Sequence, residues 1–257
     1  MEQGGPLEEI APDLFVHEGR KRFLGFVIPR CMTIVRLRDP ASDSRELVVH
    51  SPNALDPALK EAIDELGDVR VIIAPNAMHG FAVDQWAARW PEARVLVAPN
   101  FPARHPGLRF DRVLIDGPEP EWRGELDQAI VAGNPFLHEV VFLHRASRTL
   151  IVTDLIENFR REHLSMAGRI AARLIGIFGR PVPSPEHAMY TDDPEAASES
   201  LSRIAGWDFE RIILAHGARI EDDAKAALSA VTEELLTKVR SRSRGRRRLY
   251  LWMARRQ

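Results

Sequence analysis

The 257-residue sequence contains only one cysteine, Cys31. A single cysteine excludes a disulfide framework within the chain and also excludes a cysteine-rich zinc site. Any metal site in this chain must therefore use histidine and carboxylate side chains.

Long uncharged apolar runs are also missing. The best candidate, residues 167–178, is interrupted by Arg169 and Arg173, whereas a membrane-spanning helix needs roughly 20 apolar residues. The first 14 residues are acidic and lack the basic start and apolar stretch of a secretory signal. We therefore expect a cytoplasmic protein that is not inserted in a membrane.

Three common motifs are absent from the sequence. It has no Walker A sequence and no Gly-x-Gly-x-x-Gly, so a nucleotide-phosphate loop is not supported. It has no Gly-x-Ser-x-Gly, and Cys31 has no base partner in the sequence around it, which disfavours a serine or cysteine nucleophile.

Charge is distributed unevenly. From Lys238 to the end there are nine Lys and Arg and no acid, so residues 1–237 carry 26 basic and 37 acidic side chains, a formal net charge of −11. The basic end also contains an apolar cluster, residues 249–253. This end is either a solvated terminus or a contact site for an anionic membrane surface or another protein. The apolar cluster disfavours sequence-specific nucleic-acid binding.

Short apolar or β-branched runs alternate with helical patterns along the chain. The Asp-Pro pairs at 56–57 and 193–194 indicate helix starts, and Gly67 indicates a helix end. Together the elements predict an α/β or α+β sandwich of two sheets covered by helices. Strands are expected at residues 14–16, 32–37, 46–49, 69–73, 94–97, 112–115, 128–131, 139–144, 149–152 and 211–214, and helices at 56–66, 81–90, 161–179, 194–205 and 222–240.

Two of the nine histidines directly follow a strand-like run and stand beside a glycine. These are His79, after VRVIIAPNAM, and His216, after RIILA. Asp154 has the same setting after SRTLIVT. Loops at strand ends are where rigid scaffolds place functional side chains, although a helix N-cap or a hydrogen-bonded loop residue is the alternative interpretation of each.

Further polar residues lie in segments that flank these strand ends. Asn76, His138, Glu139 and His50 are secondary candidates, and Glu139 could serve as a ligand or a general base. His144 is expected in a hairpin with its turn at residues 146–147. The remaining histidines are interpreted as surface or loop residues: His17, His105, His163 and His187.

Two segments carry a resemblance to a known superfamily. HEVVFLHRASRTLIVTDL (138–155) and RIILAHG (211–217) resemble strands of the metallo-β-lactamase superfamily that deliver its metal-bridging aspartate and its last histidine. The segments IAPNAMH and FGRPVP are similar to a domain-of-unknown-function branch of that superfamily. The resemblance implies a four-layer αββα sandwich, which we expect over residues 1–220. The resemblance does not cover the helical extension with a basic tail that we expect over 221–257.

The family's ligands carry over only in part. Its His-x-His-x-Asp-His signature falls on residues 74–79, where only His79 matches; Ala74, Asn76 and Met78 replace the other ligands. Its next histidine falls near Asn134-Pro135, where no equivalent ligand exists. The resemblance therefore implies a degenerate motif that retains His79, Asp154 and His216, a set that matches one of the two metal sites.

Two imidazoles and one carboxylate can hold a single divalent ion, zinc or iron, with open positions. If the protein is catalytic, family precedent favours a metal-dependent hydrolase acting on a small molecule, with Glu139 or Asn76 orienting the attacking water. Two alternatives remain open: a metal-free binding or interaction protein on the same scaffold, and a mononuclear iron-dependent oxidoreductase.

Overall fold

The computed structural model describes the backbone of residues 4–23, 26–38, 45–122 and 124–254. Side chains are described within these ranges except at residues 22, 23, 26 and 243–254. Within the described residues, no helix is both long and apolar enough to cross a membrane.

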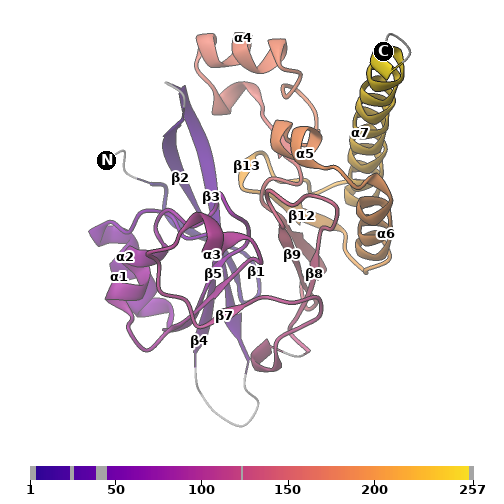
Figure 1. Cartoon of the computed structure of the whole chain (residues 1–257). Helices are drawn as coiled ribbons and strands as arrows, with labels where there is room; N and C mark the ends of the chain where they lie inside the picture. Colours follow the sequence, from indigo (N-terminus) through magenta and orange to yellow (C-terminus); the bar gives the residue numbers. More distant parts are fainter. Residues whose placement is uncertain (1–3, 24–25, 39–44, 123, 255–257) are drawn as a thin grey trace.

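The larger sheet contains the N-terminal strands in sequence order (Figure 1). Neighbouring strands are antiparallel from β1 to β4 and parallel from β4 to β7. The strands are β1 (Leu7–Ala11), β2 (Leu14–Phe23), β3 (Phe26–Leu37), β4 (Glu46–His50), β5 (Asp68–Ala74), β6 (Arg94–Val97) and β7 (Arg112–Val113).

The second sheet has the order β12-β10-β9-β8, and a short parallel pair, β11 with β13, lies beside it. Strand β10 is parallel to β12 and antiparallel to β9. The strands are β8 (Leu126–Ile130), β9 (Val140–His144), β10 (Thr149–Ile151), β11 (Glu157–Asn158), β12 (Arg211–Ile213) and β13 (His216–Gly217).

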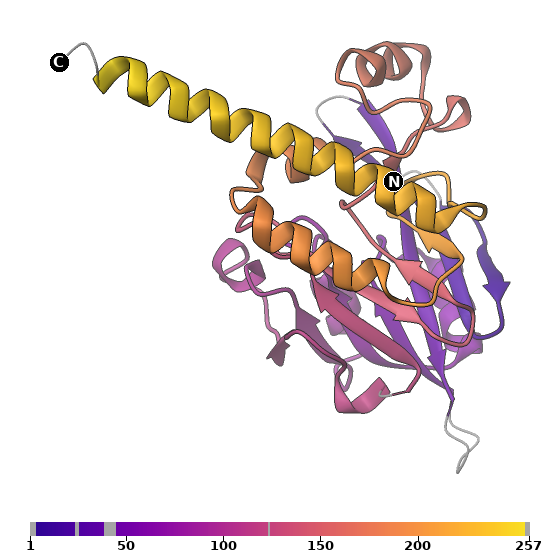
Figure 2. The same ribbon diagram turned by 90° about the vertical axis from the view of Figure 1, so that its right-hand side faces the viewer.

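Helices cover the outer face of each sheet (Figures 1 and 2). Helices α1 (Pro57–Leu66), α2 (Val83–Arg89) and α3 (Phe101–Arg104) pack on the larger sheet, and α6 (Pro194–Ala205) and α7 (Ala224–Ala254) pack on the smaller one. A third apolar cluster, including Val35, Val71, Phe142 and Ile213, fills the space between the sheets. The expected four-layer αββα sandwich is confirmed.

The helix starts expected at the Asp-Pro pairs are present because each aspartate caps a helix. The side chain of Asp56 accepts a hydrogen bond from the backbone N–H of Leu59, and Asp193 accepts from the N–H groups of Glu195 and Ala196. Gly67 follows the last residue of α1, as expected. These local signals therefore specify both helix boundaries.

The single helix expected over residues 161–179 is wrong. The structure has a 3-10 turn, Arg161–His163, and then a shorter helix, α4 (Met166–Leu174). The side chain of Ser165 caps α4 by accepting from the N–H of Gly168, and Gly176 adopts a positive φ of 80° just beyond its end. Local capping thus divides a segment whose apolar pattern looks continuous.

The structure also differs from the sequence predictions in several elements and in the burial of two histidines. Strand β1 was not expected, and β2 and β3 extend well beyond the predicted runs. The short helices α3 and α5 (Pro185–Tyr190) were not expected either. The surface interpretation of His17 and His187 is wrong, because both are buried and contact Asn53 and Glu139, respectively.

The first half of α7 packs on the smaller sheet and on α6 (Figure 2). Its buried residues recur every three or four positions, at Leu228, Val231, Leu235 and Val239, and they belong to the same cluster as Leu201 of α6. The division of the chain at residue 220 stays a prediction. The side chains of the basic tail beyond residue 242 lie outside the described residues.

Candidate metal centre

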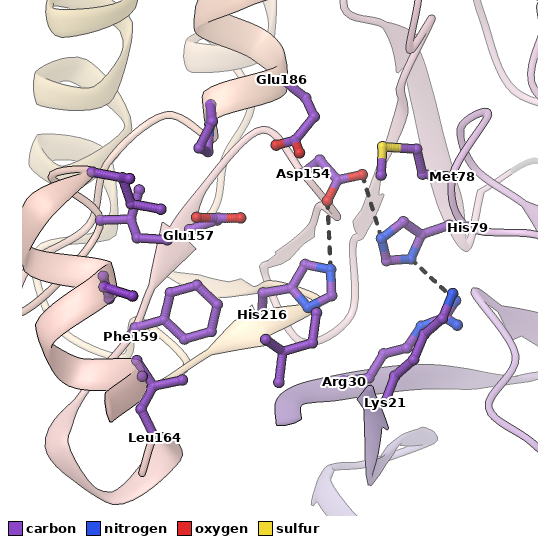
Figure 3. Close-up of a pocket in the computed structure, with 17 residues that line it drawn as sticks. Lys21, Arg30, Met78, His79, Asp154, Glu157, Phe159, Leu164, Glu186 and His216 are labelled. Atoms are coloured by element: carbon purple, nitrogen blue, oxygen red, sulfur yellow. Dashed lines mark hydrogen bonds and ion pairs between the residues drawn. The ribbon is translucent and has the colours of Figure 1, made fainter. Parts of the chain in front are cut away.

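Three strand ends bring the leading candidates together. His79 follows β5, Asp154 follows β10, and His216 begins β13 directly after β12. All three are buried, and Figure 3 shows both imidazoles directed at the carboxylate of Asp154. The residues come from both sheets, so their convergence depends on how the sheets pack together.

The donor atoms lie at distances suited to one small cation. Nε2 of His79 lies 3.3 Å from Oδ2 of Asp154, and Nε2 of His216 lies 3.5 Å from Oδ1. One ligand atom from each residue lies within 4.8 Å of the other two. Zinc bonds to nitrogen and oxygen are near 2 Å, so three atoms at these separations can share one ion. Within the described residues, no second group of three His, Cys, Asp or Glu meets this criterion.

The far nitrogen of each imidazole is held by a second group. Nδ1 of His216 lies 2.8 Å from the carbonyl oxygen of Pro29, which can only accept. Nδ1 of His216 therefore carries a proton, and Nε2 is the nitrogen that faces Asp154 and would bind an ion. Such second partners fix ring orientation at metal sites, so the residues present fit a divalent ion.

Ser51 holds the ring of His79 in a similar way. Its Oγ lies 2.6 Å from Nδ1 of His79 and also accepts from Nη2 of Arg30, at 3.3 Å. Ser51 is fully buried and has a positive φ of 55°, a conformation that is uncommon for a residue other than glycine. Nη2 of Arg30, which can only donate, also lies 3.3 Å from Nδ1 of His79. Nε2 is the nitrogen that faces Asp154 and would bind an ion.

Asn76 and Glu139 lie behind Asp154. Asn76 donates to Oδ2 of Asp154 at 2.7 Å, and its own Oδ1 accepts from the N–H of His79. Glu139 accepts from the backbone N–H groups of Thr153 and Asp154 at 2.7 and 2.9 Å. Neither lines the cavity described below, so their geometry is that of positioning residues.

Burial and the contacts within the triad shift the pKa values of His79, Asp154 and His216 in different directions. Burial lowers the pKa of His79 to about 4, although Asp154 opposes this shift, so the ring is neutral at physiological pH. Burial would raise the pKa of Asp154, but the two imidazoles hold it well below its usual range. Burial opposes protonation of His216, yet the hydrogen bond and charge of Asp154 raise its pKa.

A cavity of about 420 Å³ opens beside the triad. Lys21 and Arg30 line the end near His79, and Glu157 and Glu186 lie at the other end (Figure 3). Burial raises the pKa of Glu157 to about 8, which keeps this carboxyl neutral at pH 7. The rest of the wall is almost entirely apolar or small: Ile28, Met78, Phe159, Leu164, Gly168, Ala171, Ala172, Ile175, Ile177 and Pro185.

Arg30 is the most unusual residue of this cavity. It is 2% exposed, and its Nε and Nη1 have no hydrogen-bond partner among the described residues. Burial lowers its pKa to about 9, so the guanidinium still carries its charge at pH 7. Its side chain stacks on Phe81, with 3.9 Å between the guanidinium carbon and the ring centroid.

Sequence reasoning missed Ser51, Lys21, Arg30, Glu157 and Glu186. Strand alternation carries a signal for two of them, because Lys21 pairs with Ile28 in the β2–β3 register, which places Lys21 and Arg30 on one face. That signal was hidden because the lengths of β2 and β3 were underestimated. The positions of Ser51, Glu157 and Glu186 depend on tertiary packing alone.

The other secondary candidates do not reach the cavity. His50 is buried and packs edge-on against Phe142, with ring centroids 5.4 Å apart. His138 is not among the lining residues either. Asn134 uses its Oδ1 to accept from the N–H groups of Phe136 and Leu137, which is a structural role in its own loop.

Gly217 is required where His216 enters the site. A Cβ at this position would lie 2.3 Å from the carbonyl oxygen of Asn158, and its φ is +107°. Only glycine fits this conformation and this close approach of β13 to β11. The His216-Gly217 pair thus combines a ligand candidate with the backbone freedom that positions it.

The family model for a domain of unknown function, DUF4336, matches residues 13–172. The chain belongs to the DUF4336 family. The matched range contains His79 and Asp154 but ends before His216. No curated protein matches this DUF4336 protein significantly.

Solved structures similar to the DUF4336 protein share the metallo-β-lactamase fold. A metallo-beta-lactamase from Pontibacter korlensis is 12% identical, with a TM-score of 0.61, over 90% of this chain and 99% of that chain. The mono-zinc form of FIM-1 from Pseudomonas aeruginosa is 15% identical, with a TM-score of 0.57, over 90% and 97%. The metal-soaked Flv1 flavodiiron core from Synechocystis sp. PCC6803 is 12% identical, with a TM-score of 0.61, over 90% and 60%.

At these identities the likeness shows the fold. The DUF4336 protein therefore has a divergent form of the metallo-β-lactamase fold, and the expected resemblance is confirmed. Residues 74–79, where the sequence resemblance places the metal-binding motif of the superfamily, contain Ala74, Asn76 and Met78 before His79.

Proposed function

We propose that this DUF4336 protein is a metal-dependent hydrolase with a mononuclear site. The observation that carries the proposal is the convergence of His79, Asp154 and His216, whose ligand atoms lie within 4.8 Å of one another beside a cavity. The orientation of both imidazoles by Ser51 and by the carbonyl of Pro29 supports it further.

The three residues would hold a divalent ion, with zinc or iron suited to two nitrogens and one oxygen. Such an ion lowers the pKa of a bound water toward roughly 7 and polarises the bond under attack. The chain's own contribution is positional. Asn76 and Glu139 fix the carboxylate of Asp154 and its backbone, and the apolar wall of the cavity excludes bulk water from the site.

Metal content tests this proposal directly. Protein purified without chelator should contain about one equivalent of a divalent metal by mass spectrometry, and His216→Ala and Asp154→Asn should lose it. His163→Ala is the matched control, because His163 caps a turn outside the cavity. Absence of metal from the native protein, even after incubation with zinc or iron(II), would refute the hydrolase proposal.

A metal-free binding protein is the second candidate. It is favoured because the carboxylate of Asp154 already contacts both imidazoles and accepts a hydrogen bond from the amide of Asn76, so its charge is compensated without an ion. The melting temperature separates the two candidates, because an ion that binds only the folded state raises it. The metal-free candidate predicts no rise with added zinc or iron(II) and little change on Asp154→Asn beyond lost hydrogen bonds.

An iron-dependent oxidoreductase is the third candidate. Two histidines and one carboxylate are also the ligand set of non-haem iron(II) oxygenases. The likeness to the Flv1 flavodiiron core concerns the fold at 12% identity. Oxygen uptake by the iron(II)-loaded protein would favour this candidate, and its absence across candidate substrates would count against it.

A further inference from the structure

We infer that the cavity beside the triad binds an anionic amphiphile, with its charged head at Lys21 and Arg30 and its apolar chain against the wall that includes α4. Such an amphiphile would be the substrate class of the proposed hydrolase, and its role as substrate rests on that function. Binding itself can be measured without turnover. The carboxylate of a fatty acid and the phosphate of an alkyl phosphate supply the same head-group chemistry.

No described carboxylate forms an ion pair at the basic end of the cavity, although the charge of Asp154 acts on both Lys21 and Arg30 from farther away. Lys21 and Arg30 lie on one face of the β2–β3 hairpin and both pack on Phe81, with Nζ of Lys21 4.6 Å from its centroid. Arg30 is buried with two unpaired nitrogens, and neither cation forms an ion pair with a described acid. An unpaired buried charge is costly, and an anionic head would give Arg30 an acceptor that the described residues do not supply.

The acidic groups that face the cavity do not neutralise this end. Asp154 is engaged by His79 and His216. Glu157 and Glu186 lie across the cavity from Lys21 and Arg30 (Figure 3). An anionic head is therefore favoured at one end only, which gives the ligand a direction.

The remaining wall favours a chain rather than a sugar or a nucleotide. Phe159 and Leu164 form one side, and the inner face of α4 contributes Gly168, Ala171 and Ala172, whose small side chains leave room beside the helix. A polar ligand body would find almost no hydrogen-bond partners there. The cavity volume of about 420 Å³ falls within the range of small-molecule sites.

Calorimetric titration of the metal-free protein is the test. Dodecanoate and dodecyl phosphate represent the two anionic heads, and dodecanol and dodecyltrimethylammonium are the neutral and cationic controls. We expect both anions to bind at least about tenfold more tightly than either control, since the charged head supplies one favourable pairing. A preference between the two anions would tell which head-group source fits better.

Matched variants locate the bound ligand. Lys21→Gln and Arg30→Gln should each weaken binding of the anions by about tenfold, whereas Arg20→Gln, on the opposite face of β2, should not. Ile175→Asp should weaken binding because Ile175 lines the cavity, whereas Leu174→Asp should not, because Leu174 is outside the lining; both side chains are exposed, at 61% and 82%. Circular dichroism and melting temperature report whether each variant is folded.

Equal affinity for anionic and cationic chains would overturn the inference, as would unchanged binding in folded Lys21→Gln and Ile175→Asp proteins. No detectable binding of any probe would overturn it as well. Because binding is measured without metal, each of these results leaves the metal-content test of the hydrolase proposal unaffected. Loss of metal binding with anion binding intact would refute only the hydrolase.

A different observation concerns the outer face of α4. We propose that this face docks on an anionic lipid surface. Met166, Ile170 and Leu174, spaced by one helical turn, are 66%, 55% and 82% exposed, and we call them the outer row. Arg161, Arg169 and Arg173 lie in the same segment, and none forms an ion pair with a described acid. Arg169 donates to the carbonyl oxygens of Arg161 and Leu164, and Arg173 stacks on Phe178. Both views show α4 projecting from one end of the molecule (Figures 1 and 2).

An apolar row flanked by arginines is the pattern of an interfacial helix, and the positive charge selects anionic lipid. The same helix lines the amphiphile cavity with Gly168, Ala171 and Ala172, so docking would bring a wall of the cavity to the lipid surface. The basic tail, residues 243–257, remains a separate proposed membrane contact. Substitutions in the outer row test the α4 contact, and substitutions in the tail test the tail contact.

Co-sedimentation with vesicles tests the α4 surface. The full chain should bind phosphatidylcholine vesicles containing phosphatidylglycerol more strongly than vesicles of phosphatidylcholine alone. The double variant Ile170→Ser with Leu174→Ser should lose most of this binding, and Ile115→Ser, which changes an exposed isoleucine far along the chain, should retain it. Replacing Arg246, Arg247 and Arg248 with Gln measures the contribution of the tail.

Binding that survives in the folded double variant would overturn the α4 proposal, including the case in which only the tail variant loses binding. Equal binding to neutral and anionic vesicles would overturn the choice of an anionic surface. Absence of binding to either kind of vesicle would overturn both the α4 proposal and the choice of an anionic lipid surface.

Discussion

Oγ of Ser51 lies 2.6 Å from Nδ1 of His79, and Ser51 reaches this position with a positive φ of 55°. A residue that is not glycine adopts this conformation at some conformational cost. The cost is incurred at the turn after β4, where the hydroxyl holds the imidazole from behind. The relationship makes Ser51 a positioning residue for His79.

Removing this hydroxyl should weaken metal binding. Ser51→Ala and Ser51→Gly both delete Oγ, but glycine also relieves the positive φ. We expect both to lower metal affinity by about 10- to 100-fold, the usual effect of losing a partner of a metal-ligating histidine. Competition with a chromophoric chelator measures the affinity. Native affinity in Ser51→Gly would show that the hydroxyl does not orient His79.

Glu139→Gln should destabilise the loop that carries Asp154. Glu139 is fully buried and accepts from the N–H groups of Thr153 and Asp154 with different oxygens. An amide can accept with only one oxygen, so one backbone N–H loses its partner at a cost of about 1–3 kcal/mol in the free energy of unfolding. Urea denaturation measures this, with the exposed Glu65→Gln as control. A loss no larger than in the control would contradict the role of Glu139.

Leu235→Ala tests whether α7 is part of the core. Leu235 is fully buried in the cluster that includes α6 and the smaller sheet. Truncation should leave a cavity and lower the free energy of unfolding by about 2–5 kcal/mol. Thr237→Ala, exposed on the same helix, should change it little. Equal effects of the two variants would mean that the helix adds no stability to the sandwich.

His144 predicts a dependence of stability on pH. Burial lowers the pKa of His144 to about 4, while the unfolded chain has a value near 6.5. The unfolded state therefore takes up the proton first, and stability falls as pH decreases from about 6.5 toward 4, by about 1–3 kcal/mol. His144→Gln should show a shallower decline in urea denaturation across this range. Parallel curves for the two proteins would contradict the assignment to His144.

Local signals predicted much of the architecture. Asp56 and Asp193 cap helices where the sequence indicated, because capping involves residues only two or three positions away. The hairpin turn after His144 is also present, with Nδ1 of His144 2.7 Å from Oγ of Ser147. The prediction of one helix over 161–179 was wrong because Ser165 caps the start of α4 and Gly176 follows its end with a positive φ. Both residues are local signals for helix boundaries.

The amino-acid sequence by itself determined that His79, Asp154 and His216 follow buried strands, and its segments carried the resemblance to the fold. The tertiary structure decided that these strand ends meet, because they belong to two sheets whose packing no spacing along the chain specifies. It also decided that Arg30 is buried and unpaired beside His79, that Ser51 supports that ring, and that α4 forms a wall of the cavity. These features arise from contacts between residues far apart in sequence, and only the packed chain defines them.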